Sequence, residues 1–238
     1  MTFHDNVDPD EIAKFEKLAS RWWDPNSEFK PLHDINPLRA DWIDDLADVR
    51  GKSVLDVGCG GGLLCEALVH RGARVTGIDM GEAPLSVARL HQLESGIEVS
   101  YEQSTAESFA QQRAEAFDVV TCLEMLEHVP DPAAVVSACA ALCRPGGDLF
   151  FSTINRTVRA YLLAILGAEH LLKLLPAGTH HYEKFIRPSE LGAWCRQAGL
   201  EILDISGVMY LPFLRRALLG GDTGVNYLVH AQRARHTA

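Results

Sequence analysis

The sequence predicts an α/β fold with a doubly wound, mostly parallel sheet. From Lys52 onward, apolar runs of strand length alternate with longer helical stretches, which is typical of βαβ units. A glycine-rich turn follows the first of these runs, where such sheets bind their ligands. The chain has 238 residues, 47% of them hydrophobic and 23% charged, and can therefore bury a full core. We expect a single domain over residues 1–238.

The first 50 residues are expected to form a helical cap in front of the sheet. Asp8 is the predicted N-cap of a first helix, in which Glu11 is able to close a capping box. Residues 22–37 are rich in Pro and Asn and are expected to be irregular. A second helix is expected around Leu38–Leu46.

Seven apolar runs are expected to be strands of one sheet. The last two, Leu200–Val208 and Val225–Ala231, are predicted to pair as an antiparallel hairpin at the sheet edge, so that residues 191–232 complete the sheet. The five preceding strands are expected to be parallel, because helical stretches separate them. They are Ser53–Val57, Arg74–Ile78, Glu98–Glu102, Asp118–Leu123 and Asp148–Ile154.

Residues 156–190 interrupt the strand pattern as an insert. Its apolar run Ala160–Ala168 is shorter than the roughly 20 residues that span a bilayer. Arranged as a helix, Val158–Leu175 has a wide apolar face and a narrow polar one. Two interpretations stay open: an ordinary helix packed on the core, or an interface with a membrane or with substrate. The polar face comprises Arg159, Glu169, His170 and Lys173.

Charge and cysteine usage limit the partners and the compartment. The formal net charge of -10 argues against nucleic acid, which binds Lys and Arg. The excess of acid lies in residues 1–149, whereas residues 150–238 carry 10 Lys and Arg against 6 Asp and Glu. None of the six cysteines forms a C-x-x-C pair, which predicts buried thiols without disulfides or zinc. No secretory signal precedes the first helix, so we expect a cytoplasmic protein.

The glycine-rich turn carries the first candidate site. Its pattern is D-x-G-x-G-x-G, starting at Asp56, and Leu63 stands where the dinucleotide fingerprint requires its third glycine. This departure argues against NAD or FAD. Asp79 ends the next strand about 20 residues later, where a carboxylate can accept the hydroxyls of a ribose. The combination is stronger evidence for a ribose-containing cofactor than either part alone.

These residues resemble class I S-adenosylmethionine-dependent methyltransferases, whose sheet is Rossmann-like. The resemblance implies that S-adenosylmethionine is the cofactor and that residues 51–155 bind it. Asp56, Gly58 and Gly60 would line its methionine portion, and Asp79 would bind the ribose. The adenine and the pocket wall would contact Met80, Ala106 and Glu107, which follow the second and third strands, and Leu123, which ends the fourth.

The residues after the fourth strand usually select the methyl acceptor. This chain has Glu124, Glu127 and His128 there and lacks the Asn/Asp-Pro-Pro-aromatic run of enzymes that methylate exocyclic amines of adenine. If Glu124 begins a helical turn, the three side chains point one way. One interpretation makes His128 the general base for a phenolic hydroxyl. A second places magnesium on all three residues, and a third sees only a solvated helix start.

Further motifs resemble one family, the ubiquinone biosynthesis O-methyltransferases, over roughly residues 7–232. The resemblance implies methyl transfer to a ring hydroxyl of a polyprenylated catechol (2-polyprenyl-6-hydroxyphenol) and of 3-demethylubiquinol. It also implies that Arg39 reaches the cofactor's methionine carboxylate. These motifs are Ile12–Glu16, Ser20–Asp24, Phe29–His33, Ile35–Arg39, Cys122–Pro132, Lys184–Pro188 and Val225–Tyr227.

A membrane-soluble substrate favours the interface interpretation of the insert. We expect an anionic membrane surface to meet residues 158–187 on the inner face of the membrane, with a rim of basic side chains. A ubiquinone-biosynthesis complex is a further expected partner. The alternatives are a methyltransferase acting on O or C of another small phenol, and a scaffold that binds the cofactor without turnover. The rim consists of Arg159, Lys173, His180, His181, Lys184 and Arg187.

Overall fold

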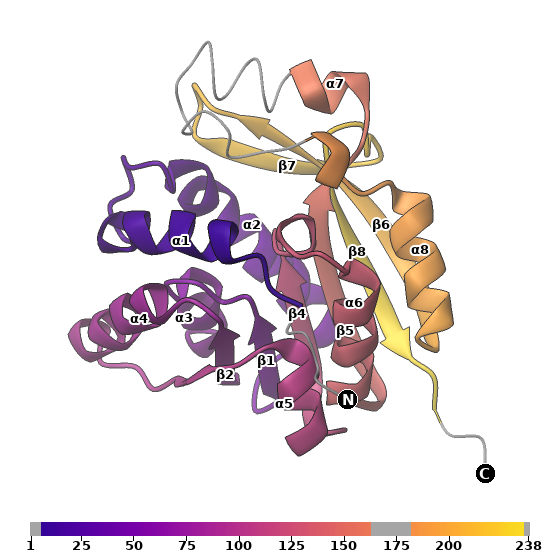
Figure 1. Cartoon of the computed structure of the whole chain (residues 1–238), viewed down its shortest axis with the longest axis horizontal. Coiled ribbons are helices and arrows are strands. Elements are labelled where there is room, and N and C mark those ends of the chain that lie inside the picture. The colour runs from indigo at the N-terminus through magenta and orange to yellow at the C-terminus, as the bar shows by residue number, and fades with distance from the viewer. Residues whose placement is uncertain (1–5, 163–181, 236–238) are drawn as a thin grey trace.

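The computed structural model describes residues 6–162 and 182–235 of the chain. It begins with helix α1 (Pro9–Leu18), a 3-10 turn η1 (Ala19–Arg21) and helix α2 (Lys30–Ala47). Asp8 is the N-cap of α1, as predicted, and its side chain accepts a hydrogen bond from the Asp10 amide. Together they form the helical cap, whose helices α1 and α2 are labelled in Figure 1.

Alternating strands and helices follow, as predicted. The parallel strands are β1 (Ser53–Val57), β2 (Arg74–Asp79), β3 (Ser100–Gln103), β4 (Phe117–Leu123) and β5 (Cys143–Ile154). The elements between them are α3 (Leu63–Val69), α4 (Glu82–Ser95), α5 (Ala106–Gln112), the 3-10 turn η2 (Leu126–His128) and α6 (Pro132–Leu142).

The last part of the chain adds three antiparallel strands. After α7 (Val158–Ala160), η4 (Tyr182–Lys184) and α8 (Pro188–Gln197) come β6 (Leu200–Leu211), β7 (Arg216–Gly220) and β8 (Asn226–Arg233). The order across the sheet is β3-β2-β1-β4-β5-β8-β6-β7. β6 and β8 are antiparallel neighbours, as predicted, but β8 lies inside the sheet against β5. The edge is formed by β7, which the sequence did not predict.

Helices cover both faces of the sheet and enclose two apolar cores. One core lies under α2, α3 and α4 and includes Ile43, Leu64 and Leu85; the other lies under α5, α6 and α8. The strand order reverses between β1 and β4, so the loops at their carboxyl ends separate there. This is the position at which doubly wound sheets bind ligands.

The prediction of an irregular segment over residues 22–37 is wrong for its second half. Residues 30–37 belong to α2, with Pro31 in the first turn and Pro37 inside the helix. Proline in a helix interior costs about 3 kcal/mol. Burial of the apolar side chains Ile35, Trp42 and Ile43 of this helix offsets that cost through tertiary packing.

Most of the predicted insert helix lies outside the described residues. Only its start, α7 with Tyr161 and Leu162, is described. None of the described helices combines the length and apolarity needed to cross a membrane.

A buried carboxylate joins the helical cap to the last strands. Asp34 on α2 accepts hydrogen bonds from Tyr210 Oη on β6 at 2.7 Å, from Arg215 Nε at 2.9 Å and from Lys30 Nζ. Its side chain is 4% exposed. Burial alone would raise the pKa of Asp34, but these hydrogen bonds lower it below its ordinary value.

We predict that Asp34→Ala destabilises the protein by about 1.5–3 kcal/mol, because it leaves charged and polar partners unsatisfied. The Asp34 contribution is present above the unfolded carboxyl pKa of about 3.9 and is lost as the pH falls through the lower folded value. Urea unfolding of wild type and variant at neutral and acidic pH measures both effects.

Asp41→Ala is the matched control, since Asp41 lies on the same helix and pairs with Arg71 at the surface. An exposed pair contributes about 0–1 kcal/mol. Equal destabilisation by the two variants would contradict the role assigned to Asp34.

Candidate active site

The loop between β1 and α3 brings backbone close to the pocket. Gly60 has φ +52, a left-handed conformation that favours glycine. A methyl group at Gly60 would lie 2.2 Å from Trp22 Cζ2, so the loop also needs glycine to pack beneath this ring. Trp23 Nε1 donates to the carbonyl of Gly61 at 2.9 Å. The Trp22-Trp23 pair therefore fixes the glycine loop from outside the sheet.

Asp79, at the end of β2, is tied to the same loop. Its Oδ2 accepts the Gly60 N–H at 2.9 Å and its Oδ1 accepts the Gly81 N–H at 2.8 Å. Burial raises the pKa of Asp79, and these backbone hydrogen bonds oppose the rise. The carboxylate thus lies where the first two loops of the sheet meet.

The predicted cofactor residues share one pocket. It is bounded by the loops after β1, β2 and β4, by the start of α5 and by α1 and α2. All nine of the residues predicted from the sequence line it: Arg39, Asp56, Gly58, Gly60, Asp79, Met80, Ala106, Glu107 and Leu123. The sequence did not predict that a further wall of this pocket is formed by residues of the N-terminal cap, some of which lie in the motifs Ile12–Glu16 and Ser20–Asp24. These residues are Asn6, Val7, Glu11, Ile12, Phe15 and Trp22.

Two buried charged groups, Arg39 and Asp56, lie at the base of the pocket beside the half-buried Glu124. Arg39 Nη1 is 3.6 Å from Glu124 Oε1, and Asp56 Oδ1 accepts the Thr121 hydroxyl at 2.6 Å. Burial raises the pKa of Asp56 to about 6, against the hydrogen bonds of Thr121 and Cys65 and the charge of Arg39. Arg39 Nε is buried and bonds no described residue. This unsatisfied N–H is suited to an acidic group of a ligand.

The three acceptor-side residues do not share one helical turn, so that expectation is wrong. Glu124 has φ +53, and the 3-10 turn η2 starts only at Leu126. Glu124 Oε1 accepts the Ser152 hydroxyl at 2.8 Å, while Glu127 Oε2 accepts that of Thr153 at 2.8 Å. Glu124 therefore lines the pocket, but Glu127 is 3% exposed and does not.

His128 also lines the pocket and is held from the N-terminal helix. Its Nδ1 lies 3.0 Å from Glu11 Oε2, and the ring of Phe15 meets the imidazole edge-on with centroids 5.2 Å apart. Glu11 therefore does not close the predicted capping box. A contact across 117 residues carries no signal in the sequence.

The predicted magnesium ligands are separately engaged. No group of three or more His, Cys, Asp or Glu side chains within residues 6–162 and 182–235 is arranged to hold a metal ion. Glu127 Oε1 is buried without a hydrogen-bond partner among these residues. Burial and the nearby charge of Glu124 raise the pKa of Glu127 to about 7. Glu127 therefore has a free oxygen next to the charge of Glu124, but the three residues together are not a metal site.

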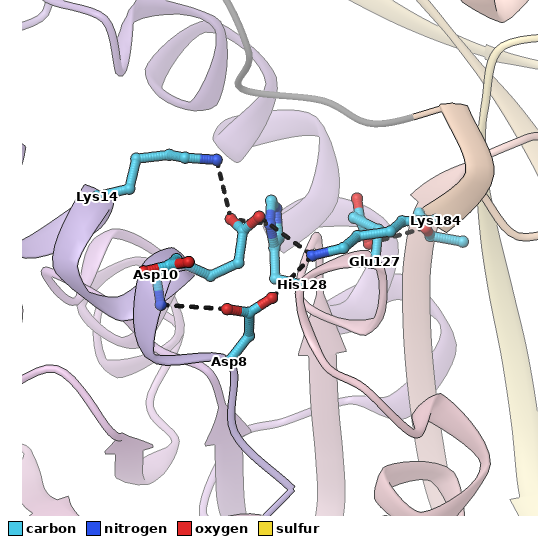
Figure 2. Close-up of polar contacts among 8 residues, drawn as sticks. Asp8, Asp10, Lys14, Glu127, His128 and Lys184 are labelled. Atoms are coloured by element: carbon cyan, nitrogen blue, oxygen red, sulfur yellow. Dashed lines mark hydrogen bonds and ion pairs between the residues drawn. The ribbon is translucent and has the colours of Figure 1, made fainter.

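Lys184, predicted to face a membrane, instead lies beside the pocket. Its Nζ is 3.0 Å from Asp8 Oδ2 and 3.3 Å from Glu11 Oε1 (Figure 2). Arg159, another member of that predicted rim, pairs with Asp222. Two of the six expected membrane-facing groups therefore bind carboxylates of this chain.

Solved structures show the same fold. Magnesium protoporphyrin IX methyltransferase from Synechocystis, with bound SAM, matches with TM-score 0.65 and 17% identity over 97% of this chain and 100% of that one. A SAM-dependent methyltransferase from Aquifex aeolicus matches with TM-score 0.61 and 15% identity over 93% and 97% of the two chains.

Sequence relatives show the family. Residues 32–205 match the methyltransferase domain family. The ubiquinone biosynthesis O-methyltransferases of Azotobacter vinelandii and Pseudomonas entomophila are 67% and 65% identical over 96% of this chain and 98% of theirs. The fold, the pocket and these similarities agree. The chain belongs to the ubiquinone biosynthesis O-methyltransferases, which use S-adenosylmethionine as methyl donor.

Proposed function

We propose that this enzyme methylates a ring hydroxyl of 2-polyprenyl-6-hydroxyphenol and of 3-demethylubiquinol. One observation carries the proposal: the same pocket has the glycine loop and Asp79 among its lining residues and the imidazole of His128 as well. Donor and acceptor can therefore be held together, which is the main contribution that an enzyme makes to a displacement reaction. The names of the family relatives support the substrate class.

The cofactor's position follows from the polar groups of the pocket. We assign Asp79 to the ribose hydroxyls and Arg39, with its unsatisfied Nε, to the methionine carboxylate. Gly58 and Gly60 let the backbone approach the methionine portion, with Asp56 below them. Met80, Ala106 and Glu107 would flank the adenine, and Leu123 would close the pocket.

Acceptor activation is assigned to His128. A phenolic hydroxyl has a pKa of about 10 and is mostly protonated at neutral pH, so a base at the pocket increases its nucleophilicity. When bound, S-adenosylmethionine supplies a methyl carbon activated by a sulfonium. Transfer of that methyl group to the hydroxyl oxygen would leave S-adenosylhomocysteine, and His128 Nε2 would take up the hydroxyl proton. Glu124, on the same pocket wall, is assigned to orient the acceptor.

We predict that the protein converts a short-chain demethylubiquinol analogue, and the matching catechol, into their methyl ethers with one S-adenosylhomocysteine per turnover. Mass spectrometry and proton NMR of the products measure the stoichiometry and the methylated atom. Asp79→Ala is the inactive control, because it removes the ribose acceptor.

Two other results would overturn this assignment. Methylation at ring carbon would identify a C-methyltransferase. Cofactor binding without any methylated product from either acceptor would favour the non-catalytic scaffold.

Magnesium is a second candidate component of the acceptor site. Oε1 of Glu127 has no hydrogen-bond partner among the described residues, and the charge of Glu124 helps to raise the pKa of Glu127. Both features support a cation bound at Glu127, and oxygen ligands suit magnesium. His128 is not included among the ligands, because its Nδ1 bonds Glu11 and the three residues are not arranged to hold one ion. Such an ion would lower the pKa of a catechol oxygen bound to it.

We predict that exhaustive chelation lowers the methylation rate and that added magnesium restores it. Rates with and without chelator, at saturating cofactor, measure the effect. The same assay on Glu127→Gln, which no longer carries the second charge, should be indifferent to both treatments. A wild-type rate that ignores the chelator would leave His128 acting alone.

We propose membrane contact for the described residues that immediately precede residues 163–181. Val158 and Leu162 are 71% and 50% exposed there, and Phe213 in the turn between β6 and β7 is 86% exposed. Exposed apolar groups of this kind suit the boundary of a bilayer that holds a polyprenyl substrate. The ubiquinone-biosynthesis complex stays a prediction from the family resemblance.

We predict that the protein floats with anionic liposomes and that Leu162→Asp reduces the floated fraction severalfold. Leu93→Asp, at a leucine of α4 that is 76% exposed, is the matched control and should leave flotation unchanged. Equal flotation of wild type and Leu162→Asp would remove this segment from the membrane contact.

A further inference from the structure

Glu11 is a buried carboxylate in helix α1, 117 residues before His128 in the sequence. Its side chain is 8% exposed and lies on the pocket wall. Oε2 is 3.0 Å from His128 Nδ1 and 3.1 Å from Lys14 Nζ, while Oε1 is 3.3 Å from Lys184 Nζ. Figure 2 shows His128 and Lys184 side by side, with Asp8 next to them.

We propose that Glu11 is a positioning residue for His128, holding the imidazole with Nδ1 toward α1 and Nε2 available to the methyl acceptor. The inference rests on the proposed function, because it gives His128 its role in acceptor activation. Glu11 itself touches neither cofactor nor acceptor in this assignment; it acts through the imidazole.

The chemistry of the two groups fixes the tautomer. An ionised carboxylate only accepts hydrogen bonds, so the ring nitrogen facing it carries the hydrogen. In the neutral imidazole, Nδ1–H then donates to Glu11, and Nε2 keeps the lone pair that takes up a proton. Nε2 makes no hydrogen bond to any residue of the described parts of the chain. A base oriented by a carboxylate is the arrangement that activates nucleophiles in many enzymes.

The surroundings of Glu11 keep it an acceptor. Lys14, one turn further along α1, and Lys184, in η4, place cations against its two oxygens. Asp8 shares Lys184, so the charged groups at this site are two carboxylates and two ammonium groups, beside the imidazole. Burial alone would raise the pKa of Glu11, but the hydrogen bonds and charges of His128 and Lys14 lower it below its ordinary value.

Phe15 restricts the remaining freedom of the imidazole. Its ring lies one turn after Glu11 on α1 and meets His128 at an interplanar angle of 88°. The same helix thus supplies the hydrogen-bond acceptor and the apolar contact that hold the base. Helix α1 therefore positions His128 in addition to covering the pocket.

A double-mutant cycle tests the proposal. We expect His128→Ala to lower kcat about 10²–10⁴-fold, as for loss of a general base. We expect Glu11→Ala to lower kcat about 10–100-fold, since a displacement of about 1 Å can cost this much. In the His128→Ala background, Glu11→Ala should have almost no further effect on kcat. The dissociation constant of S-adenosylhomocysteine should stay within about twofold of wild type in each protein.

Two further variants separate positioning from folding. Glu11→Gln keeps the size of the side chain and an amide oxygen for Nδ1–H, so its kcat should lie between those of wild type and Glu11→Ala. Glu16→Ala, at an exposed glutamate of the same helix, should match wild type. Thermal unfolding of every variant accompanies the kinetics, and Glu11→Gln carries the test if Glu11→Ala does not fold.

Additive losses in the cycle would overturn the proposal, because they would mean that Glu11 acts independently of His128. So would wild-type kcat in both Glu11 variants, or a loss confined to cofactor binding. A wild-type enzyme that methylates neither acceptor would instead refute the proposed function. The two failures are therefore distinguishable in the same set of assays.

Discussion

The hydrogen bond from the Gly60 amide to the Asp79 carboxylate joins the two loops on which the cofactor end of the pocket depends. It can form because β1 and β2 are parallel neighbours whose carboxyl ends reach the same edge of the sheet. The bond also holds Asp79 beside the glycine loop before any ligand is present. Trp22 packs against the outer side of the glycine loop, so this loop also connects the N-terminal cap to the sheet.

Several charged side chains in and near the pocket are buried away from water. Arg39 and Asp56, which line the pocket, and Glu127, which does not, are all buried, and Arg39 Nε and Glu127 Oε1 make no hydrogen bond within the described residues. Such groups are costly for stability unless they are paired. Buried groups of this kind are suited to ligand binding, because a ligand can supply the hydrogen bond that an unsatisfied donor or acceptor in a cavity lacks.

Periodicity and motif spacing were sufficient to predict the five parallel strands, and the candidate cofactor residues that they indicated lie in one pocket. Buried parallel strands are apolar runs, and the glycine turn and Asp79 lie directly after two of them. The β7 strand escaped prediction because its residues are mostly exposed and give no burial pattern. Residues 30–37 escaped because their prolines are locally unfavourable in a helix. The Glu11–His128 contact joins distant segments, so only the folded chain shows it.

The bonds of Asp34 also bear on how the protein matures during synthesis. Helix α2 leaves the ribosome early, yet Tyr210 and Arg215 are translated more than 170 residues later. The nascent helical cap therefore lacks these anchors until β6 and the turn after it have been synthesised. A ribosome-bound intermediate can form the parallel half of the sheet, but its cap is not yet fastened to the final strands.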